Sequence, residues 1–217
     1  MSQIAIDGPA GAGKSTVARE VSKCLGFMYV DTGAMYRTIA LECIKKGIDL
    51  NNEELVSSVC EDSKISIKYI DSVQHMYIAD EDVSSEIRTE EAGKGASMVA
   101  KYAAVRRKLV SLQQELGREY NVVMDGRDIC SCVLPNADLK IFLTASAGCR
   151  AKRRYDELIS KGIEADLEEI KEDIENRDYN DSHRKISPLK KAPDATEIDT
   201  SDMTIEEATN AVIKLWK

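Results

Sequence analysis

The stretch that decides the fold is Gly8-Pro9-Ala10-Gly11-Ala12-Gly13-Lys14-Ser15-Thr16. It matches Gly-x-x-x-x-Gly-Lys-Ser/Thr at every specified position, which is the pattern of a phosphate-binding loop. A short apolar segment, residues 3–7, precedes the loop, and residues 17–25 follow it with apolar side chains at a helical spacing. Strand, glycine-rich loop and helix form the context that this motif needs. An ordinary glycine-rich turn before a helix is therefore the weaker interpretation.

The residue types in this loop suit a chain of phosphates. Glycines allow backbone N–H groups to turn toward a phosphate, and the N-terminus of the next helix adds partial positive charge. Lys14 can reach the β- and γ-phosphates, and the Ser15 hydroxyl can bind Mg²⁺. We therefore expect residues 8–16 to bind a nucleoside triphosphate, which leaves the phosphate acceptor to be identified.

Length, composition and charge limit the class of protein and its possible partners. The 217 residues suffice for one large domain with a buried core, and 43% hydrophobic and 31% charged residues are ordinary values for a soluble globular protein. A net charge of −8 argues against nucleic acid or an anionic membrane as a partner. No apolar run approaches the roughly 20 residues of a membrane span, and no signal-peptide pattern opens the chain. We expect a cytoplasmic monomer.

The cysteines and histidines do not form a metal-binding pattern. The closest cysteines, Cys130 and Cys132, stand too near each other for a usual zinc knuckle, and we expect the six cysteines to be reduced thiols. The sequence contains two histidines, so we do not expect histidine to supply a general base or a metal site.

Strands and helices alternate along most of the chain. Further buried strands are expected at residues 27–31, 121–125, 139–144 and 195–199. Helices are expected after Thr32 and after Thr204, which can cap them, at 52–60, at 89–120 with a junction near residue 102, and at 147–179 with a break at Gly162. Strands separated by helices imply a parallel sheet with right-handed crossovers.

The hydrophobic period changes between residues 62 and 88. Residues 65–69 and 76–79 alternate apolar and polar side chains, residues 71 and 72 can form the turn between them, and residues 81–83 can add a third short strand. We predict an antiparallel hairpin that is inserted into the parallel fold.

Three groups of residues narrow the identity of the acceptor. The first is the apolar strand that ends at Asp125, because a carboxylate at this place in a phosphate-loop protein can hold Mg²⁺ directly or through water. A plain turn aspartate is the alternative.

The second group is the stretch Asp31 to Arg37, which follows a predicted strand at the edge where open α/β sheets bind ligands. Arg37 can clamp a second phosphate there, or be an ordinary surface arginine.

The third group is a set of arginines in a helical, otherwise acidic region. Its members are Arg150, Arg153, Arg154, Arg177 and Arg184. Arginine suits phosphate because its planar guanidinium is always charged. A mobile helical flap that carries arginines would exclude water from the site and neutralise charge during phosphoryl transfer. The alternative is a helical hairpin laced with salt bridges.

Together these groups resemble the bacterial cytidylate kinases, which are nucleoside monophosphate kinases. The resemblance rests on residues 6–16, 31–37, 84–88, 125–128 and 177–184, extended by 187–189 and 198–201. It covers essentially the whole chain. It implies a phosphate-loop α/β fold with a five-stranded parallel sheet and flanking helices, an inserted antiparallel acceptor-binding subdomain, and a helical LID.

The resemblance also implies three domains. The CORE would comprise residues 1–31, 103–149 and 186–217. The acceptor-binding domain would comprise 32–102, with the β insertion at about 62–88. The LID would comprise 150–185.

The resemblance further implies a role for each matching residue. The nucleotide acceptor CMP or dCMP would contact Asp31, Thr32, Arg37, Ser97, Arg106, Arg127, Asp128, Arg177, Asp181 and Arg184. Arg184 and Ser97 would read the base, Asp181 and Arg177 would meet the sugar, and Arg37 and Arg127 would grip the α-phosphate. Arg150 and Arg154 would close over ATP from the LID. The residues closest to the reaction would be Lys14, Arg37, Arg127, Asp128 and Arg154, and Mg²⁺ would lie at Ser15 and Asp125.

Transfer from ATP to a nucleotide phosphate needs no strong base. The acceptor phosphate is already an anionic nucleophile, so positioning and charge neutralisation suffice. The alternatives are a kinase for uridylate or for a small alcohol such as shikimate, and a nucleotide-binding switch without enzyme activity. One residue departs from the family pattern: Cys130 stands where glycine is common, which puts the local backbone in question.

Overall fold

Five parallel strands form the central sheet of the computed structural model, which describes residues 1–216. The strands are β1 (Gln3–Asp7), β2 (Met28–Asp31), β6 (Val122–Gly126), β7 (Leu139–Thr144) and β8 (Thr196–Asp199). Their order is β2-β6-β1-β7-β8. Ile6 of β1 lies opposite Ile141 of β7, and Leu143 of β7 lies opposite Ile198 of β8. The five-stranded parallel sheet predicted from the sequence is confirmed.

The chain divides into two compact units. One consists of Met28–Val122 together with Met1, and the other combines Ser2–Phe27 with the chain from Val123 onward. We call them the hairpin unit and the loop unit, respectively. No helix within residues 1–216 has the length and apolar character to cross a membrane.

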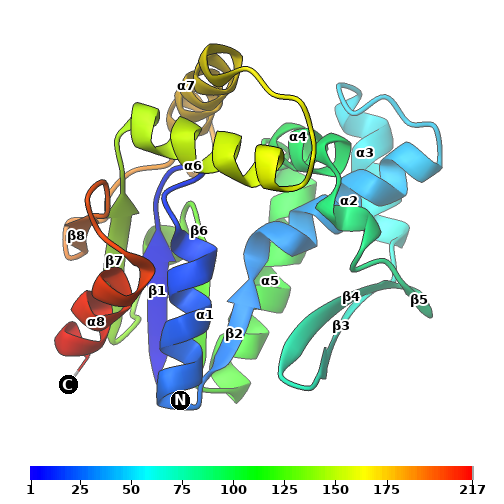
Figure 1. Cartoon of the computed structure of the whole chain (residues 1–217). Coiled ribbons are helices and arrows are strands. Elements are labelled where there is room, and N and C mark those ends of the chain that lie inside the picture. Colours follow the sequence, from blue (N-terminus) through cyan, green and yellow to red (C-terminus); the bar gives the residue numbers. More distant parts are fainter. Residues whose placement is uncertain (217) are drawn as a thin grey trace. The chain divides into compact units, whose positions relative to one another are not determined.

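The loop unit contains β1, β7 and β8 and four helices. The helices are α1 (Lys14–Leu25), α6 (Ala147–Ser160), α7 (Leu167–His183) and α8 (Ile205–Leu215). Helices α1 and α8 pack against each other beside the strands (Figure 1), and Phe27 meets Trp216 edge-on with ring centroids 5.6 Å apart. Thr204 caps the start of α8, as the sequence predicted, and Glu207 completes a capping box that was not predicted.

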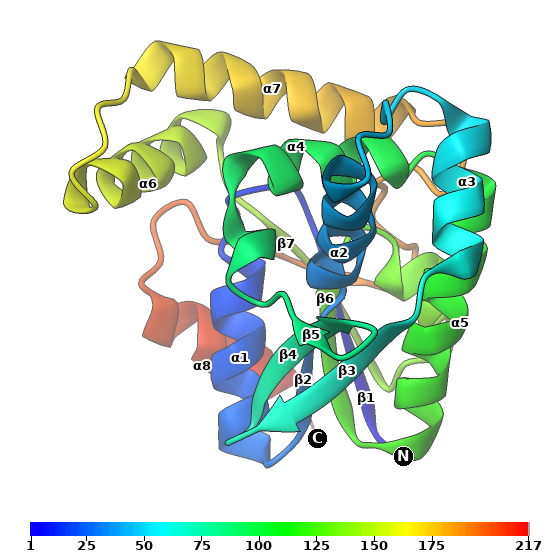
Figure 2. The same ribbon diagram turned by 90° about the vertical axis from the view of Figure 1, so that its right-hand side faces the viewer.

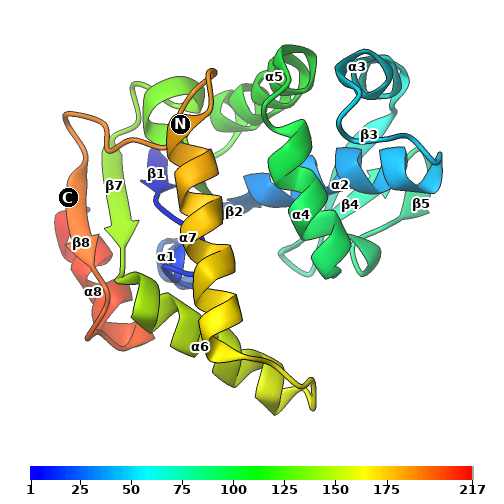
Figure 3. The same ribbon diagram turned by 90° about the horizontal axis from the view of Figure 1, so that it is seen from above.

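Helices α6 and α7 form a helical hairpin (Figures 2 and 3). The break near Gly162 is confirmed, and this glycine has a φ of 73°, in the left-handed region. One further turn of helix was not predicted: residues Ile129–Val133 form a π-helical turn directly after the strand β6 and Arg127-Asp128. Such turns occur often at functional sites.

The hairpin unit contains β2, four helices and a second sheet. The helices are α2 (Thr32–Lys45), α3 (Glu53–Asp62), α4 (Glu90–Val99) and α5 (Ala103–Glu119), with a 3₁₀ turn at Glu86–Arg88. Helix α2 packs against α3, α4 and α5 (Figure 2). The core of the unit includes Met35, Ile39, Val56, Met76 and Leu109, so the second sheet shares a core with these helices.

The second sheet is the predicted antiparallel hairpin. Its strands are β3 (Ile65–Ile70), β4 (Val73–Ile78) and β5 (Glu81–Asp82), in the order β3-β4-β5. Ile70 lies opposite Val73, so Asp71 and Ser72 form a two-residue turn. Both have positive φ, 50° and 64°, which is the backbone of the tight turns that match the twist of a hairpin.

The predicted cap of α2 was wrong by one residue. Thr32 is the first residue of the helix, and Asp31 is the cap: its carboxylate accepts a hydrogen bond from Ala34 N at 2.9 Å. Aspartate and threonine both cap helices well, so two adjacent capping residues leave the boundary undecided in the sequence. Because Asp31 also ends β2, the strand and the helix meet at this carboxylate.

The packing of α4 on α2 generates a stability prediction. A Cβ at Gly95 would lie 2.9 Å from both Ala40 Cβ and Leu50 Cδ1, whereas a Cβ at Gly93 on the same helix would have no neighbour within 4 Å. We expect Gly95→Ala to lower the free energy of unfolding by about 1 kcal/mol, because overpacking outweighs the gain in helix propensity. Urea unfolding followed by circular dichroism measures the change.

Gly93→Ala is the matched control. This variant gains helix propensity without a clash, so we expect it to raise the free energy of unfolding by about 0.5–1 kcal/mol. Equal effects of the two substitutions would contradict the close approach of α4 to α2.

Candidate active site

The loop unit contains the predicted phosphate-binding loop between β1 and α1. Gly8 has a φ of 150°, and a Cβ there would lie 1.9 Å from the Leu143 carbonyl oxygen, so no other residue fits. Gly11 and Gly13 also have positive φ, 75° and 86°. Gly13 is the cap residue of α1 and supplies no side chain to it, which leaves the first N–H groups of the helix available to an anion.

The Lys14 side chain is buried and folds back against this loop. Its ammonium group donates to the Pro9 carbonyl oxygen at 2.7 Å. Burial lowers the pKa of Lys14 to about 7, and repulsion from Arg127 and Arg177 contributes, although Asp125 and Asp7 oppose the shift. A bound phosphate would favour the charged form of Lys14.

The two residues predicted to hold a metal ion lie together. The Ser15 hydroxyl donates to Asp125 Oδ2 at 2.9 Å, and Asp125 is buried. A hydroxyl and a carboxylate oxygen side by side are the hard oxygen ligands that Mg²⁺ prefers. Within residues 1–216 no group of three or more histidine, cysteine, aspartate or glutamate side chains is arranged to hold a metal. Mg²⁺ needs no such cage, because water and substrate phosphates complete its ligands.

Asp7 is a residue of the site that sequence reasoning missed. It is 1% exposed and accepts hydrogen bonds from the backbone N–H groups of Ile129 and Cys130, at 2.8 and 2.9 Å. Burial raises its pKa to about 6, with a small contribution from Asp128, although these hydrogen bonds hold the pKa down. Asp7 therefore ties the strand before the phosphate loop to the π-helical turn after Asp128. Its place directly before Gly8 is the only local signal.

The π-helical turn contains Cys130, which stands where glycine is common in the family. The backbone φ of Cys130 is not positive, so this position does not require glycine. The Cys130 side chain is buried, and its thiol lies 3.5 Å from the Ala5 carbonyl oxygen and 3.6 Å from that of Ile141. Cysteine therefore fits the family's glycine position by filling space between two strands.

Carboxylates hold several of the predicted arginines. Arg127 Nε donates to Asp181 Oδ2 at 2.8 Å, and Arg184 lies 3.5 Å from Asp128 Oδ1. Burial alone would raise the pKa of Asp181, but Arg127, Arg177 and Arg184 together hold it below its usual range. The structure thus brings together these five predicted CMP-binding residues of the loop unit.

The two predicted LID arginines differ in their surroundings. Arg150 is 5% exposed, and it donates from Nε to the Ala145 carbonyl, from Nη1 to the Ala10 carbonyl and from Nη2 to Asp178 Oδ2. Arg154 is exposed enough to meet a ligand, and its partner is Glu157 on the same helix at 2.9 Å. Contact with ATP remains a prediction for both, and for Arg150 it would compete with bonds inside the protein.

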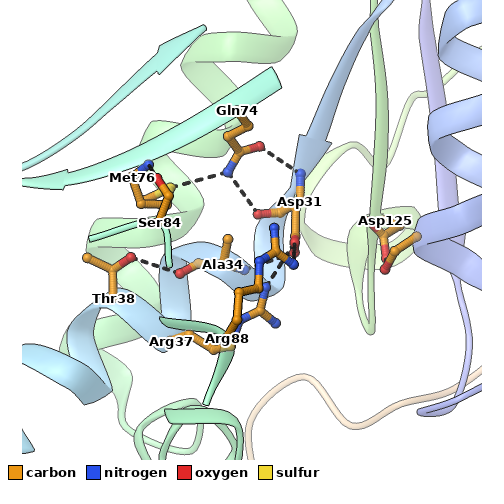
Figure 4. Close-up of polar contacts among 10 residues, drawn as sticks. Asp31, Ala34, Arg37, Thr38, Gln74, Met76, Ser84, Arg88 and Asp125 are labelled. Atoms are coloured by element: carbon orange, nitrogen blue, oxygen red, sulfur yellow. Dashed lines mark hydrogen bonds and ion pairs between the residues drawn. The ribbon is translucent and has the colours of Figure 1, made fainter. Parts of the chain in front are cut away.

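In the hairpin unit, Asp31 gathers two arginines at the end of β2 (Figure 4). Its Oδ2 accepts from Arg37 Nη2 at 2.9 Å and from Arg88 Nη1 at 3.4 Å. Arg37 Nε is buried without a hydrogen-bond partner. Gln74 of β4 bonds to both the backbone N–H and the carbonyl of Asp31, at 2.8 and 3.1 Å, and so fixes the inserted sheet to this point.

The sequence assigns no role to Arg88, although this residue ends one of the stretches that carry the family resemblance. Its side chain is more than half exposed, and its guanidinium lies 3.4 Å from the Asp31 carboxylate. A pair of guanidinium groups at one carboxylate forms a compact positive site that suits a phosphate group. We therefore add Arg88 to the candidate residues.

The other predicted acceptor residues of the hairpin unit lie on its helices. Thr32 is buried in the first turn of α2. Ser97 is half-buried on α4, and Arg106 is buried on α5, where Nη1 lies 3.5 Å from the Ala100 carbonyl oxygen. Their contact with a nucleotide stays a prediction.

Solved structures with a similar fold include an uncharacterized protein and a shikimate kinase. An uncharacterized protein from Eubacterium ventriosum matches with a TM-score of 0.53 at 12% identity, covering 99% of this chain and 98% of that one. Shikimate kinase from Bacteroides thetaiotaomicron matches with a TM-score of 0.50 at 12% identity, covering 99% and 97%. Identities this low show the fold alone.

Sequence comparison is more specific. The cytidylate kinase family model matches residues 4–217. The cytidylate kinase of Pediococcus pentosaceus is 49% identical over 98% of this chain and 94% of its own length. The cytidylate kinases of Lactobacillus johnsonii and Bacillus licheniformis are 47% and 48% identical over 98% of this chain and 93% and 94% of theirs. The chain therefore belongs to the cytidylate kinase family.

Proposed function

We propose that this enzyme transfers the γ-phosphoryl group of ATP to CMP, and also to dCMP, to give ADP and CDP or dCDP. The observation that carries the proposal is the family match over residues 4–217, which spans both the phosphate loop and the arginines. The matches to the two cytidylate kinases cover 98% of this chain and 94% and 93% of the relatives' own lengths, which supports the same activity.

ATP binds at the phosphate loop in this proposal. The loop residues 8–16 supply N–H groups, and Lys14 supplies a charge to the β- and γ-phosphates. The adjacent oxygens of Ser15 and Asp125 support a Mg²⁺ site, with Asp125 acting directly or through water. When bound, Mg²⁺ neutralises phosphate charge and orients the triphosphate.

The acceptor nucleotide binds through the residues that the family resemblance assigns to it. Arg37 and Arg127 hold the α-phosphate, Arg184 and Ser97 recognise the base, and Asp181 and Arg177 meet the sugar. The remaining contacts come from Asp31, Thr32, Arg106 and Asp128. The ion pairs of Arg37 with Asp31 and of Arg127 with Asp181 support these roles, because each arginine is already oriented before a phosphate arrives.

The transfer step needs charge neutralisation rather than a base. The acceptor phosphate attacks the γ-phosphorus in line, and the arginines and Lys14 stabilise the charge that spreads over the transferred group. Arg150 and Arg154 belong to the proposed LID, residues 150–185, which closes over ATP and excludes water. The division into CORE (1–31, 103–149 and 186–217), acceptor-binding domain (32–102) and LID completes this proposal.

We also propose that the enzyme works as a monomer in the cytoplasm and binds neither nucleic acid nor membrane. The net charge of −8 supports the absence of a nucleic acid partner. The cysteines are free thiols, which suits a reducing compartment.

A coupled assay of ADP release with CMP, dCMP, UMP or AMP as acceptor tests the activity. We expect turnover with CMP and dCMP and far less with UMP and AMP. Turnover with UMP alone would contradict the cytidylate assignment. If none of the four acceptors caused ADP release, the protein would not be a nucleotide kinase. ADP release with shikimate as acceptor would then indicate a small-alcohol kinase. ATP binding without any turnover would indicate a nucleotide switch.

The lowered pKa of Lys14 predicts that the protein takes up a proton when it binds ATP. Its pKa of about 7 leaves most of the free protein with a neutral Lys14 at pH 8, whereas the phosphates favour the charged form. We expect up to about one proton to be taken up per ATP bound at pH 8. Calorimetric titration with preformed Mg-ATP, in buffers of different ionisation enthalpy, counts the protons.

Lys14→Arg is the control for this measurement, since arginine is charged before and after binding. We expect the variant to bind ATP with little dependence of the heat on the buffer. A heat that is independent of buffer in the unmodified enzyme would show that Lys14 is already protonated there.

Arg37→Ala tests the assignment of the acceptor phosphate. We expect kcat/KM for CMP to fall by about 10²–10³, because a charged ligand of the phosphate is lost, while the Kd for ATP changes less than about twofold. Arg118→Ala removes an exposed arginine of α5 in the same unit and should leave both quantities unchanged. An equal loss of ATP affinity in Arg37→Ala would place Arg37 on the donor side.

A further inference from the structure

Helix α7 presents two carboxylates to arginines from two other segments of the loop unit. Asp178 pairs with Arg150 of α6 at 2.6 Å, and Asp181 pairs with Arg127 after β6 at 2.8 Å. Residues three apart lie on one side of a helix, so one face of α7 holds both arginines. The neighbouring Arg177 and Arg184 act on Asp181 as well.

Arg150 connects this face to the phosphate loop. Its guanidinium bonds to Ala10 O in the loop at 3.0 Å and to Ala145 O at 2.8 Å, and its third donor reaches Asp178. A Cβ at Gly11 would lie 3.2 Å from Arg150 Cβ, so the start of α6 lies directly against the loop. A single buried side chain thus joins the loop, α6 and α7.

Asp178 directs its charge to this arginine. Its Oδ2 accepts from Arg150, and its Oδ1 is buried without a hydrogen-bond partner. A buried carboxylate oxygen left unpaired is costly, so the pairing of the other oxygen must hold the side chain in place. A solvated salt bridge of a helical hairpin would leave both oxygens open to water.

We propose that Arg150 and Asp178 are a positioning pair, which fixes α7 to the phosphate loop and thereby orients Asp181 and Arg127 for the acceptor nucleotide. This inference rests on the proposed function, in which Arg127 and Asp181 contact CMP. In this inference Arg150 acts inside the protein, and Arg154 alone of the two proposed LID arginines contacts the phosphates of ATP. Asp178 acts through Arg150 and touches neither nucleotide.

Asp178→Asn is the decisive variant. Asparagine keeps the size of the side chain and removes its charge, while the bonds of Arg150 to the two carbonyl oxygens can remain. We expect KM for CMP to rise about tenfold, with the Kd for ATP changed less than about twofold. Asp173→Asn removes the same charge from an exposed position of α7, and its kinetics should equal those of the unmodified enzyme.

A double-mutant cycle with Arg150→Met tests whether the two residues act as one. We expect Asp178→Asn to have less than about a twofold effect on KM for CMP when Arg150 is already methionine. Independent, multiplying effects would overturn the proposal. A rise in the Kd for ATP alone, in either single variant, would show instead that Arg150 is a ligand of ATP.

Hydrogen exchange provides a readout that does not depend on the identity of the substrate. If the pair fixes α7, backbone amides of residues 167–183 should exchange faster in Asp178→Asn and Arg150→Met than in Asp173→Asn, with no change in α8. Unchanged exchange in α7 would overturn the inference even in an active enzyme. An unmodified enzyme that fails to phosphorylate CMP would contradict the proposed function alone, because exchange still tests the pair.

Discussion

The pairing of buried cations with carboxylates is the constraint on which the site depends. Lys14, Arg127 and Arg150 are removed from most of the solvent, and a buried charge is tolerable only where another charge or hydrogen bonds compensate it. Asp125, Asp178 and Asp181 supply that compensation in the loop unit, and Asp31 does so for two arginines of the hairpin unit. Within each unit, these ion pairs orient the arginines that are proposed to bind phosphate.

Backbone geometry supports this arrangement of charges. Gly8 lets the phosphate loop pass the Leu143 carbonyl, and Asp7 immediately before it fixes the π-helical turn that follows Asp128. Asp7, the last residue of β1, and Gly8 directly after it thus link the phosphate loop to the turn that follows Asp128. Gln74 has a comparable role in the hairpin unit, where it connects the inserted sheet to Asp31.

Local patterns predicted the fold well, because its elements are long and periodic. The five strands, the hairpin with its turn at residues 71 and 72, and the Thr204 cap of α8 each have a signal within a few residues. The cap of α2 was misplaced since Asp31 and Thr32 are both good caps. Asp7 and Asp178 could not be found in this way: their partners lie 122 and 28 residues away, and only the folded chain brings them together.

The spacing of Asp178 and Asp181 has a consequence for how this chain can change in length. With 3.6 residues per turn, one inserted or deleted residue between them would rotate one carboxylate by about 100° around the axis of α7. One of the two arginines would then lose its partner, and a buried guanidinium would be left uncompensated. The loop between α6 and α7, by contrast, carries no such pair and can vary in length. We expect insertions among related sequences to collect at residues 161–166 and to avoid the segment from 178 to 181.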